Sequence, residues 1–190
     1  RIGRQEKDIA VITAAMSEGT GMEPFREAFP ERFFDVGIAE QHAVTMAAGL
    51  AMGGMKPVVA IYSSFLQRAY DQMLHDVALQ RLHVVFAIDR AGLVGADGET
   101  HQGVYDIAYC LTMPYVEIYS PASKGELEEM LKMAVEGDVP AAVRYGKGTL
   151  PDRVYPAVEY GKWIEIKPIA KVTVVATGRM VEIAERAVGN

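Results

Sequence analysis

Cysteine is nearly absent from this sequence of 190 residues, in which Cys110 is the single example. One cysteine excludes an internal disulfide and suits a reducing compartment. No apolar run is long enough to span a bilayer, and the opening residues RIGRQEK lack the apolar centre of a signal peptide. From these absences we expect a cytoplasmic protein with no membrane partner.

Dense blocks of one charge are also missing. The formal net charge is −6, from 19 Lys and Arg against 25 Asp and Glu, and both signs are spread along the chain. We therefore expect no nucleic-acid partner. The composition, 50% hydrophobic and 23% charged, supports one sizeable core. Because the chain starts on a charged run without Met, we expect it to come from the middle of a longer protein.

Short apolar runs alternate with longer helical patterns between residues 8 and 145. Several runs are β-branched and almost continuously apolar, as in strands covered on both faces. This alternation predicts an α/β fold, a three-layer α/β/α arrangement around a mostly parallel sheet of about six strands. The predicted strands are 8–15, 32–36, 57–62, 83–89, 115–118 and 141–145, with helices near 20–28, 39–52, 65–80 and 123–136.

The last part of the chain has a different pattern. Residues 146–170 are rich in Pro, Gly and Lys and suggest a linker with some extended structure. Residues 171–177 then read as a new strand, followed by an amphipathic helix that reaches Val188. We expect two units: residues 1–160 form the main domain, and residues 161–190 are a linker and the first strand–helix unit of a truncated domain.

The first candidate residue for chemistry is Glu40. In open parallel sheets, ligands bind beyond the carboxyl ends of the strands, so polar residues that follow strands come first. Glu40 follows the predicted strand 32–36 and falls in the first turn of the next helix. Spacing alone favours the simpler interpretation, a solvated carboxylate near a helix N-terminus.

Two further groups follow the next strands. Tyr62, Phe65 and Arg68 come after strand 57–62 and offer aromatic rings and a cation, although aromatic residues at this spacing usually belong to a helix core. The glycine-rich loop after strand 83–89 contains Arg90, which suits a phosphate, and His101, which suits proton transfer.

Asp97 lies in the same glycine-rich loop, where a turn before Gly98 is the simpler explanation for it. Arg144 and Lys147 follow the strand at 141–145, with glycines beside them. Basic residues in an exposed loop are common, so the signal for this last anion site is weak.

Taken together, these segments resemble the 1-deoxy-D-xylulose-5-phosphate synthase family of the transketolase-like superfamily. The resemblance covers residues 8–150 without an obvious gap, and the tail resembles the start of the third domain of that family. Its most specific phrases are FDVGIAEQHAV at 34–44, AIYSSFLQRAYDQ at 60–72, AIDRAGLVGADG at 87–98 and THQG at 100–103. Each of the four segments gives only a weak signal, but together they occur in the order found in this family. The resemblance therefore favours a functional explanation of these residues over a purely structural one.

The resemblance implies a thiamine-diphosphate site. Glu40 would bind N1′ of the aminopyrimidine ring as the catalytic acid, and Phe65 would stack on that ring with Tyr62 and Arg68 beside it. The substrates would be pyruvate and glyceraldehyde 3-phosphate, and the product would feed isoprenoid, thiamine and pyridoxal synthesis. Members are homodimers, which we expect of the full-length enzyme.

The same resemblance implies a substrate pocket. Arg90 would hold the phosphate of the aldehyde substrate, while Tyr62, Asp97 and His101 would line the pocket, with His101 as a second catalytic residue. The family usually reads RYPRG where this chain has RYGKG at 144–148. A family phosphate ligand is therefore Lys147 here, which keeps the charge but loses bidentate geometry, and Arg144 is a second candidate for that contact.

One family element is missing from the sequence. The family holds the diphosphate and its Mg²⁺ through a Gly-Asp-Gly…Asn motif on an N-terminal domain, and this chain has no such motif. We expect no metal ligands in this chain and no turnover by the chain alone. Two alternatives stay open: a 2-oxo acid dehydrogenase β-type subunit, and a non-catalytic half-module that needs a partner chain.

Overall fold

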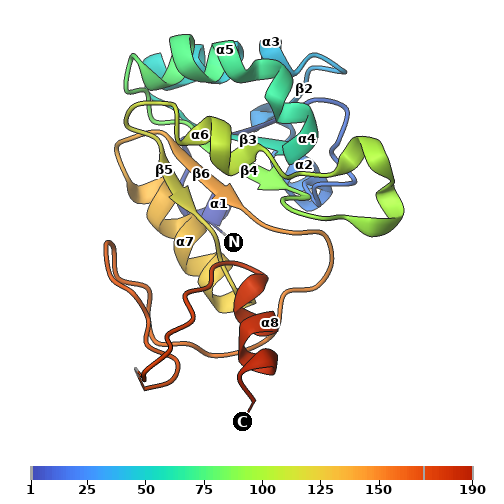
Figure 1. The fold of residues 1–190 in the computed structure, drawn as a ribbon. Coiled ribbons are helices and arrows are strands. Elements are labelled where there is room, and N and C mark those ends of the chain that lie inside the picture. The colour runs from blue at the N-terminus through green and yellow to red at the C-terminus, as the bar shows by residue number, and fades with distance from the viewer. Residues whose placement is uncertain (1, 169, 190) are drawn as a thin grey trace.

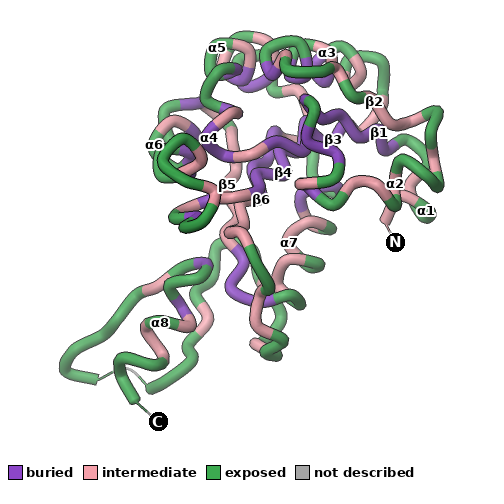
Figure 2. Tube along the Cα trace, turned by 90° about the vertical axis from the view of Figure 1, so that its right-hand side faces the viewer, coloured by how far each residue is buried: buried purple, intermediate pink, exposed green. Residues whose placement is uncertain are grey.

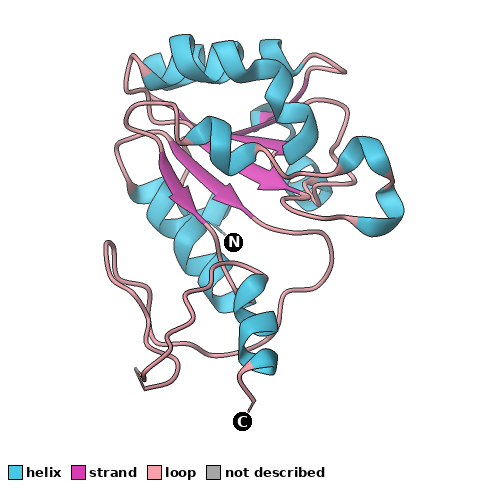
Figure 3. Ribbon diagram, in the orientation of Figure 1, coloured by secondary structure: helices cyan, strands magenta, loops and turns pink. Residues whose placement is uncertain are grey.

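A six-stranded parallel sheet forms the centre of the protein in a computed structural model that describes residues 2–168 and 170–189 (Figures 1 and 3). The strand order is β2-β1-β3-β4-β6-β5, and every pairing is parallel. The strands are β1 (Ile9–Thr13), β2 (Phe33–Asp35), β3 (Lys56–Tyr62), β4 (Val85–Asp89), β5 (Glu117–Tyr119) and β6 (Ala141–Arg144). Each of the six overlaps a predicted strand, so the predicted fold is confirmed.

Helices cover both faces of this sheet. The helices are α1 (Ile2–Gln5), α2 (Glu23–Ala28), α3 (Glu40–Met52), α4 (Ser63–Leu66), α5 (Tyr70–Gln72), α6 (Asp106–Cys110), α7 (Lys124–Glu136) and α8 (Met180–Ala187). Short 3-10 turns occupy Pro30–Arg32, Gln67–Ala69, Gly95–Asp97 and Glu99–His101, and a π-helix spans Met73–Ala78. None of the helices in the described ranges has both the length and the apolar character needed to cross a bilayer.

Burial is concentrated in the four inner strands β1, β3, β4 and β6 and in the helix faces turned toward them (Figure 2). One core cluster joins α3, α4 and the π-helix to the sheet through residues such as Ile12, Ala47 and Phe86. The other joins Val11 and Val85 to the inner side of α7. The continuous apolarity of β1 and β4 is therefore explained, because both strands are buried along their whole length.

The sheet has a point where the direction of the strand order reverses. The chain leaves β1 for β2 on one side and then returns to β3 on the other side of β1. Such a switch point leaves a crevice at the carboxyl ends of the strands, because the two crossover connections move apart there. The segments that follow β1 and β3 therefore meet at the natural position for a ligand.

Beyond small differences at the strand ends, two local predictions differ from the structure. The predicted strand at 171–177 is wrong: these residues pair with no strand in the described ranges, and Val172, Val174 and Val175 are exposed. A strand needs a neighbour for its backbone groups, and apolar alternation alone does not supply one. The predicted helix at 65–80 is present, but it starts at Ser63 and changes from α to 3-10 to α to π along its length.

Candidate functional site

Glu40 occupies the first position of α3, just after β2. The Oδ1 atom of Asp35 accepts hydrogen bonds from the backbone N–H of Ala15 (2.8 Å) and of Gly37 (3.0 Å), which ties this turn to the end of β1. The side chain of Glu40 is 2% exposed, and Arg68 donates to both of its carboxylate oxygens at 3.2 and 3.4 Å. A buried acid with one half-exposed cation beside it differs from the solvated carboxylate that spacing alone favours.

An aromatic group lies next to this acid. The guanidinium of Arg68 sits 5.5 Å from the ring centre of Phe65. The ring of Phe65 stacks on Tyr62 with centroids 5.8 Å apart and meets the edge of His101 at 5.0 Å. Four predicted site residues thus come together with Glu40, although they come from three segments of the chain.

A charged cluster extends this row of side chains. Arg90 lies over the ring of Tyr62, with Cζ 4.0 Å from the ring centre, and its Nη1 donates to Asp89 at 2.7 Å. Nε of Arg90 lies 3.7 Å from Oδ2 of Asp97, and Lys147 forms an ion pair with the other oxygen of Asp97. The structure therefore brings Arg90, Asp97 and Lys147 together at one end of the aromatic group.

The electrostatics of this cluster differ between its two acids. The hydrogen bond from Lys147 is the main reason that the pKa of Asp97 is lowered, and Arg90 adds to it. Burial raises the pKa of Asp89 in spite of its bonds to Arg90, and burial likewise raises the pKa of the Tyr62 phenol. Asp97 is held as an anion between two cations, while Asp89 is the acid that burial disfavours in its charged form.

Arg144 is not part of the cluster. Its Nε donates to Oδ2 of Asp106 at 2.6 Å, its Nη2 lies 3.3 Å from Oδ1 of the same carboxylate, and its Nη1 donates to Ser120 at 3.3 Å. Asp106 is 2% exposed, so this is a buried ion pair that joins β6 to α6. The geometry gives Lys147, and not Arg144, the position next to Arg90.

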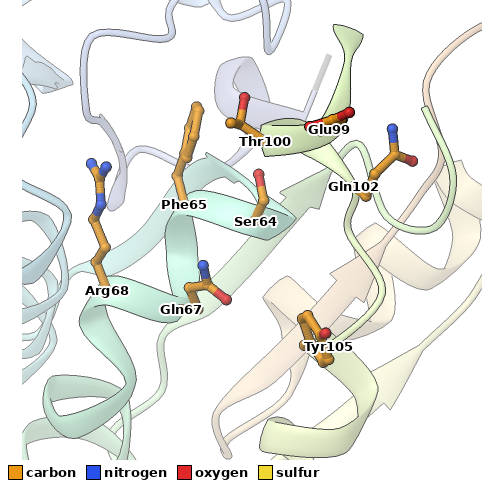
Figure 4. A pocket seen from close by; sticks show the side chains of 8 residues that line it. All are labelled: Ser64, Phe65, Gln67, Arg68, Glu99, Thr100, Gln102 and Tyr105. Carbon is orange, nitrogen blue, oxygen red and sulfur yellow. The ribbon is translucent and has the colours of Figure 1, made fainter. Parts of the chain in front are cut away.

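A cavity of about 370 Å³ has Phe65 and Arg68 on one side and Gln102 on the other (Figure 4). Ser64 lies between Phe65 and Gln102, and Gln67 and Tyr105 lie below Ser64 in this view. The Oγ atom of Ser64 is buried and has no hydrogen-bond partner among the described residues. A buried hydroxyl without a partner costs stability unless a ligand or water satisfies it.

These groups fit a flat ring that bears nitrogen atoms. A buried carboxylate can bind a ring nitrogen, an aromatic face can stack on the ring, and an unpartnered hydroxyl lies beside that face. The described part of the chain contains no group of three His, Cys, Asp or Glu side chains arranged as ligands for a metal ion. The donor set suits an aminopyrimidine.

Comparison with known proteins agrees with this geometry. Residues 1–153 match the family profile described as "Transketolase, pyrimidine binding domain". The chain belongs to the transketolase pyrimidine-binding domain family. Proteins named 1-deoxy-D-xylulose-5-phosphate synthase from Clostridium kluyveri and Heliobacterium modesticaldum are both 54% identical to it, and the alignments cover 96% and 98% of this chain. The chain spans only 30% of the length of either relative.

Solved structures support the membership. A chain titled as a split-gene transketolase in an inactive β4 tetramer aligns with a TM-score of 0.85 and 32% identity, covering 96% of this chain and 60% of that chain. Transketolase from Pichia stipitis, solved with sedoheptulose 7-phosphate, aligns with a TM-score of 0.72 over 82% of this chain and 25% of that one. At 19% identity the second likeness shows the fold alone.

Three residues near the site were not predicted from the sequence. Ser64 and Asp106 are buried polar residues, and Gly19 contacts both Tyr62 and Arg90. The run SEGTG at 17–21, a few residues after β1, is the one signal that spacing offers, because glycines after a strand often permit a close approach. Asp106 gave no such signal, since its partner Arg144 is 38 residues away.

Proposed function

We propose that this chain is the pyrimidine-binding part of a thiamine-diphosphate-dependent transferase. The reaction would join pyruvate, with loss of carbon dioxide, to glyceraldehyde 3-phosphate and give 1-deoxy-D-xylulose 5-phosphate. The observation that carries the proposal is the buried carboxylate of Glu40 at the switch point of the sheet, paired with Arg68, whose guanidinium also lies 5.5 Å from the ring centre of Phe65. The names of the close relatives support the choice of substrates.

Glu40 acts on the pyrimidine ring in this proposal. Thiamine diphosphate, when bound, supplies a carbon nucleophile for the ketone of pyruvate and takes up the charge left by decarboxylation. The carboxylate of Glu40 holds a proton at ring nitrogen N1′, and its burial keeps water away from that hydrogen bond. Phe65 supplies the flat face that orients the ring, with Tyr62 beside it, and Arg68 balances the charge of Glu40.

The charged cluster binds the aldehyde substrate. Arg90 and Lys147 neutralise its phosphate, and Asp97 holds these two cations in place through its two oxygens. Nε of Arg90 is buried and makes no hydrogen bond among the described residues, which leaves it a donor for a ligand oxygen. His101 lies against the aromatic rings of Phe65 and Tyr62. It is the candidate for moving a proton at the carbonyl oxygen of the substrate.

The wider arrangement follows from the same proposal. The diphosphate and Mg²⁺ would be held outside this chain, in a cytoplasmic homodimer of the full-length protein, and a second unit would begin near residue 161. A half-module that needs a partner chain is the second candidate, favoured by the likeness to a split-gene transketolase chain. A β-type subunit of a 2-oxo acid dehydrogenase would require a lipoyl acceptor instead of the aldehyde.

The test compares two purified proteins, this chain and a full-length protein that contains it. Each receives thiamine diphosphate, Mg²⁺, [2-¹⁴C]pyruvate and glyceraldehyde 3-phosphate, and labelled deoxyxylulose phosphate is measured by chromatography. We expect product from the full-length protein only. Transfer of the labelled carbon from pyruvate to an added lipoyl acceptor, and not to the aldehyde, would refute the proposal. Formation of deoxyxylulose phosphate only after a separate partner chain is added would favour the half-module.

A further inference from the structure

The turn after β1 packs against the proposed substrate pocket. Its backbone is closed by hydrogen bonds from Thr20 N–H to Met16 (2.9 Å) and from Met22 N–H to Ser17 (2.9 Å), and the Thr20 hydroxyl donates to the Met16 carbonyl at 2.7 Å. The sulfur of Met16 accepts from the backbone N–H of Tyr62 at 3.5 Å. The turn is therefore fixed internally and also tied to the end of β3.

Gly19, in the middle of this turn, lies against the phenol of Tyr62. A Cβ atom at position 19 would overlap the Tyr62 hydroxyl, and it would lie 2.8 Å from Cζ and 3.3 Å from Cε1 of that ring. Gly19 does not have a positive φ, so its need for glycine comes from space and not from backbone conformation. Tyr62 has little room to move aside, because its ring packs against Phe65 and Arg90.

The carbonyl of Gly19 has a second role. It accepts a hydrogen bond from Nη1 of Arg90, a residue 71 positions further along the chain. Arg90 has a φ of +55°, a left-handed backbone that a non-glycine residue adopts only when its surroundings hold it. Gly19 thus leaves room for the phenol of Tyr62 because it has no side chain, and its backbone carbonyl binds the guanidinium of Arg90.

We propose that Gly19 is a positioning residue that sets Tyr62 and Arg90 together at the phosphate end of the substrate pocket. Three loops, after β1, β3 and β4, meet at this residue, so a small displacement there moves both substrate-facing groups at once. This inference rests on the proposed function for the identity of the substrate. The contact between Gly19 and Tyr62 can be tested without it.

The kinetic test uses Gly19→Ala in the full-length protein. We expect KM for glyceraldehyde 3-phosphate to rise about ten- to a hundred-fold, as when one hydrogen bond to a charged group is lost, with a smaller change in kcat and in KM for pyruvate. Gly125→Ala is the matched control, because its added Cβ would meet only Ser123 Oγ at 3.9 Å on α7. The control should leave all three constants at their wild-type values.

The second test measures coupling in urea unfolding of this chain. Gly19→Ala should lower the unfolding midpoint, and the loss should be smaller in a Tyr62→Phe background, where the overlapping hydroxyl is gone. Equal losses in both backgrounds, or a Gly19→Ala protein with wild-type KM values, would overturn the inference. If the wild-type full-length protein forms no product, the proposed function fails, and the coupling alone then decides the role of Gly19.

Discussion

Replacing Asp106 with Ala should strongly destabilise this chain. The carboxylate is 2% exposed and receives two hydrogen bonds from Arg144, whose side chain is 14% exposed. Removing one partner of a buried pair leaves the other charge uncompensated, which typically costs about 3–5 kcal/mol. Arg144 keeps its contact with Ser120 and some access to water, so we expect the lower end, about 3 kcal/mol.

A graded variant refines the prediction. Asp106→Asn keeps one carbonyl oxygen as an acceptor for Nε of Arg144 but loses the charge, so its cost should be about 1.5 kcal/mol, the lower end for a bond to a charged group. The pair formed by Lys132 and Glu136 supplies the control, because both side chains are more than half exposed. Lys132→Ala should cost about 0.5 kcal/mol or less.

Urea unfolding followed by circular dichroism gives all three values. With a slope of about 2 kcal/mol per molar urea, the Asp106→Ala midpoint should fall by about 1.5 M. The reasoning fails if Asp106→Ala costs no more than Lys132→Ala. It also fails if Asp106→Asn and Asp106→Ala are equally destabilised, since the retained acceptor would then have no effect.

Two further predictions concern titration. NMR of labelled carboxyl carbons should show that the pKa of Asp89 lies above the ordinary value of 3.8 and that the pKa of Asp97 lies below it. The stabilisation of the fold by ionised Asp97 and Lys147 is therefore present above the unfolded pKa of Asp97 and lost as pH falls through its folded pKa. The contribution of Asp89 to stability is present below its unfolded pKa and lost as pH rises through its folded pKa. Reversed directions would contradict the charged cluster. Burial raises the pKa of Cys110 to about 12, so its thiol should resist iodoacetamide at pH 8 in the native chain and react after unfolding; rapid native labelling by mass spectrometry would disprove this.

The fold could be predicted because most of its strands carry their own signal. Runs such as 57–62 and 83–89 are buried on both faces and therefore apolar at nearly every position. The predicted strand 115–118 begins too early, because Tyr115 has a φ of +64° that a strand does not allow. The failure at 171–177 has a different origin, since pairing depends on a neighbouring strand that a local pattern does not reveal.

The site could be predicted only in part. Glu40, Phe65 and Arg90 are candidates from the sequence because each follows a strand, and the family resemblance implies their roles, which stay predictions. The ion pair of Glu40 joins residues 28 positions apart, and the hydrogen bond from Arg90 to Gly19 joins residues 71 positions apart. Spacing rules describe only near neighbours in the sequence, so they predict neither contact. For Arg144, the basic side chain suits an anion site in the sequence, whereas the structure pairs it with the buried carboxylate of Asp106.

The most direct test of the central claim is Glu40→Gln in the full-length protein. Glutamine keeps the shape of the side chain but cannot hold the acidic proton at the pyrimidine ring, and loss of such a group typically lowers the rate about 10²–10⁴-fold. Formation of deoxyxylulose phosphate is measured at saturating thiamine diphosphate, with circular dichroism to verify the fold. We predict a folded protein with turnover reduced by that factor, and wild-type turnover would contradict the assignment of Glu40.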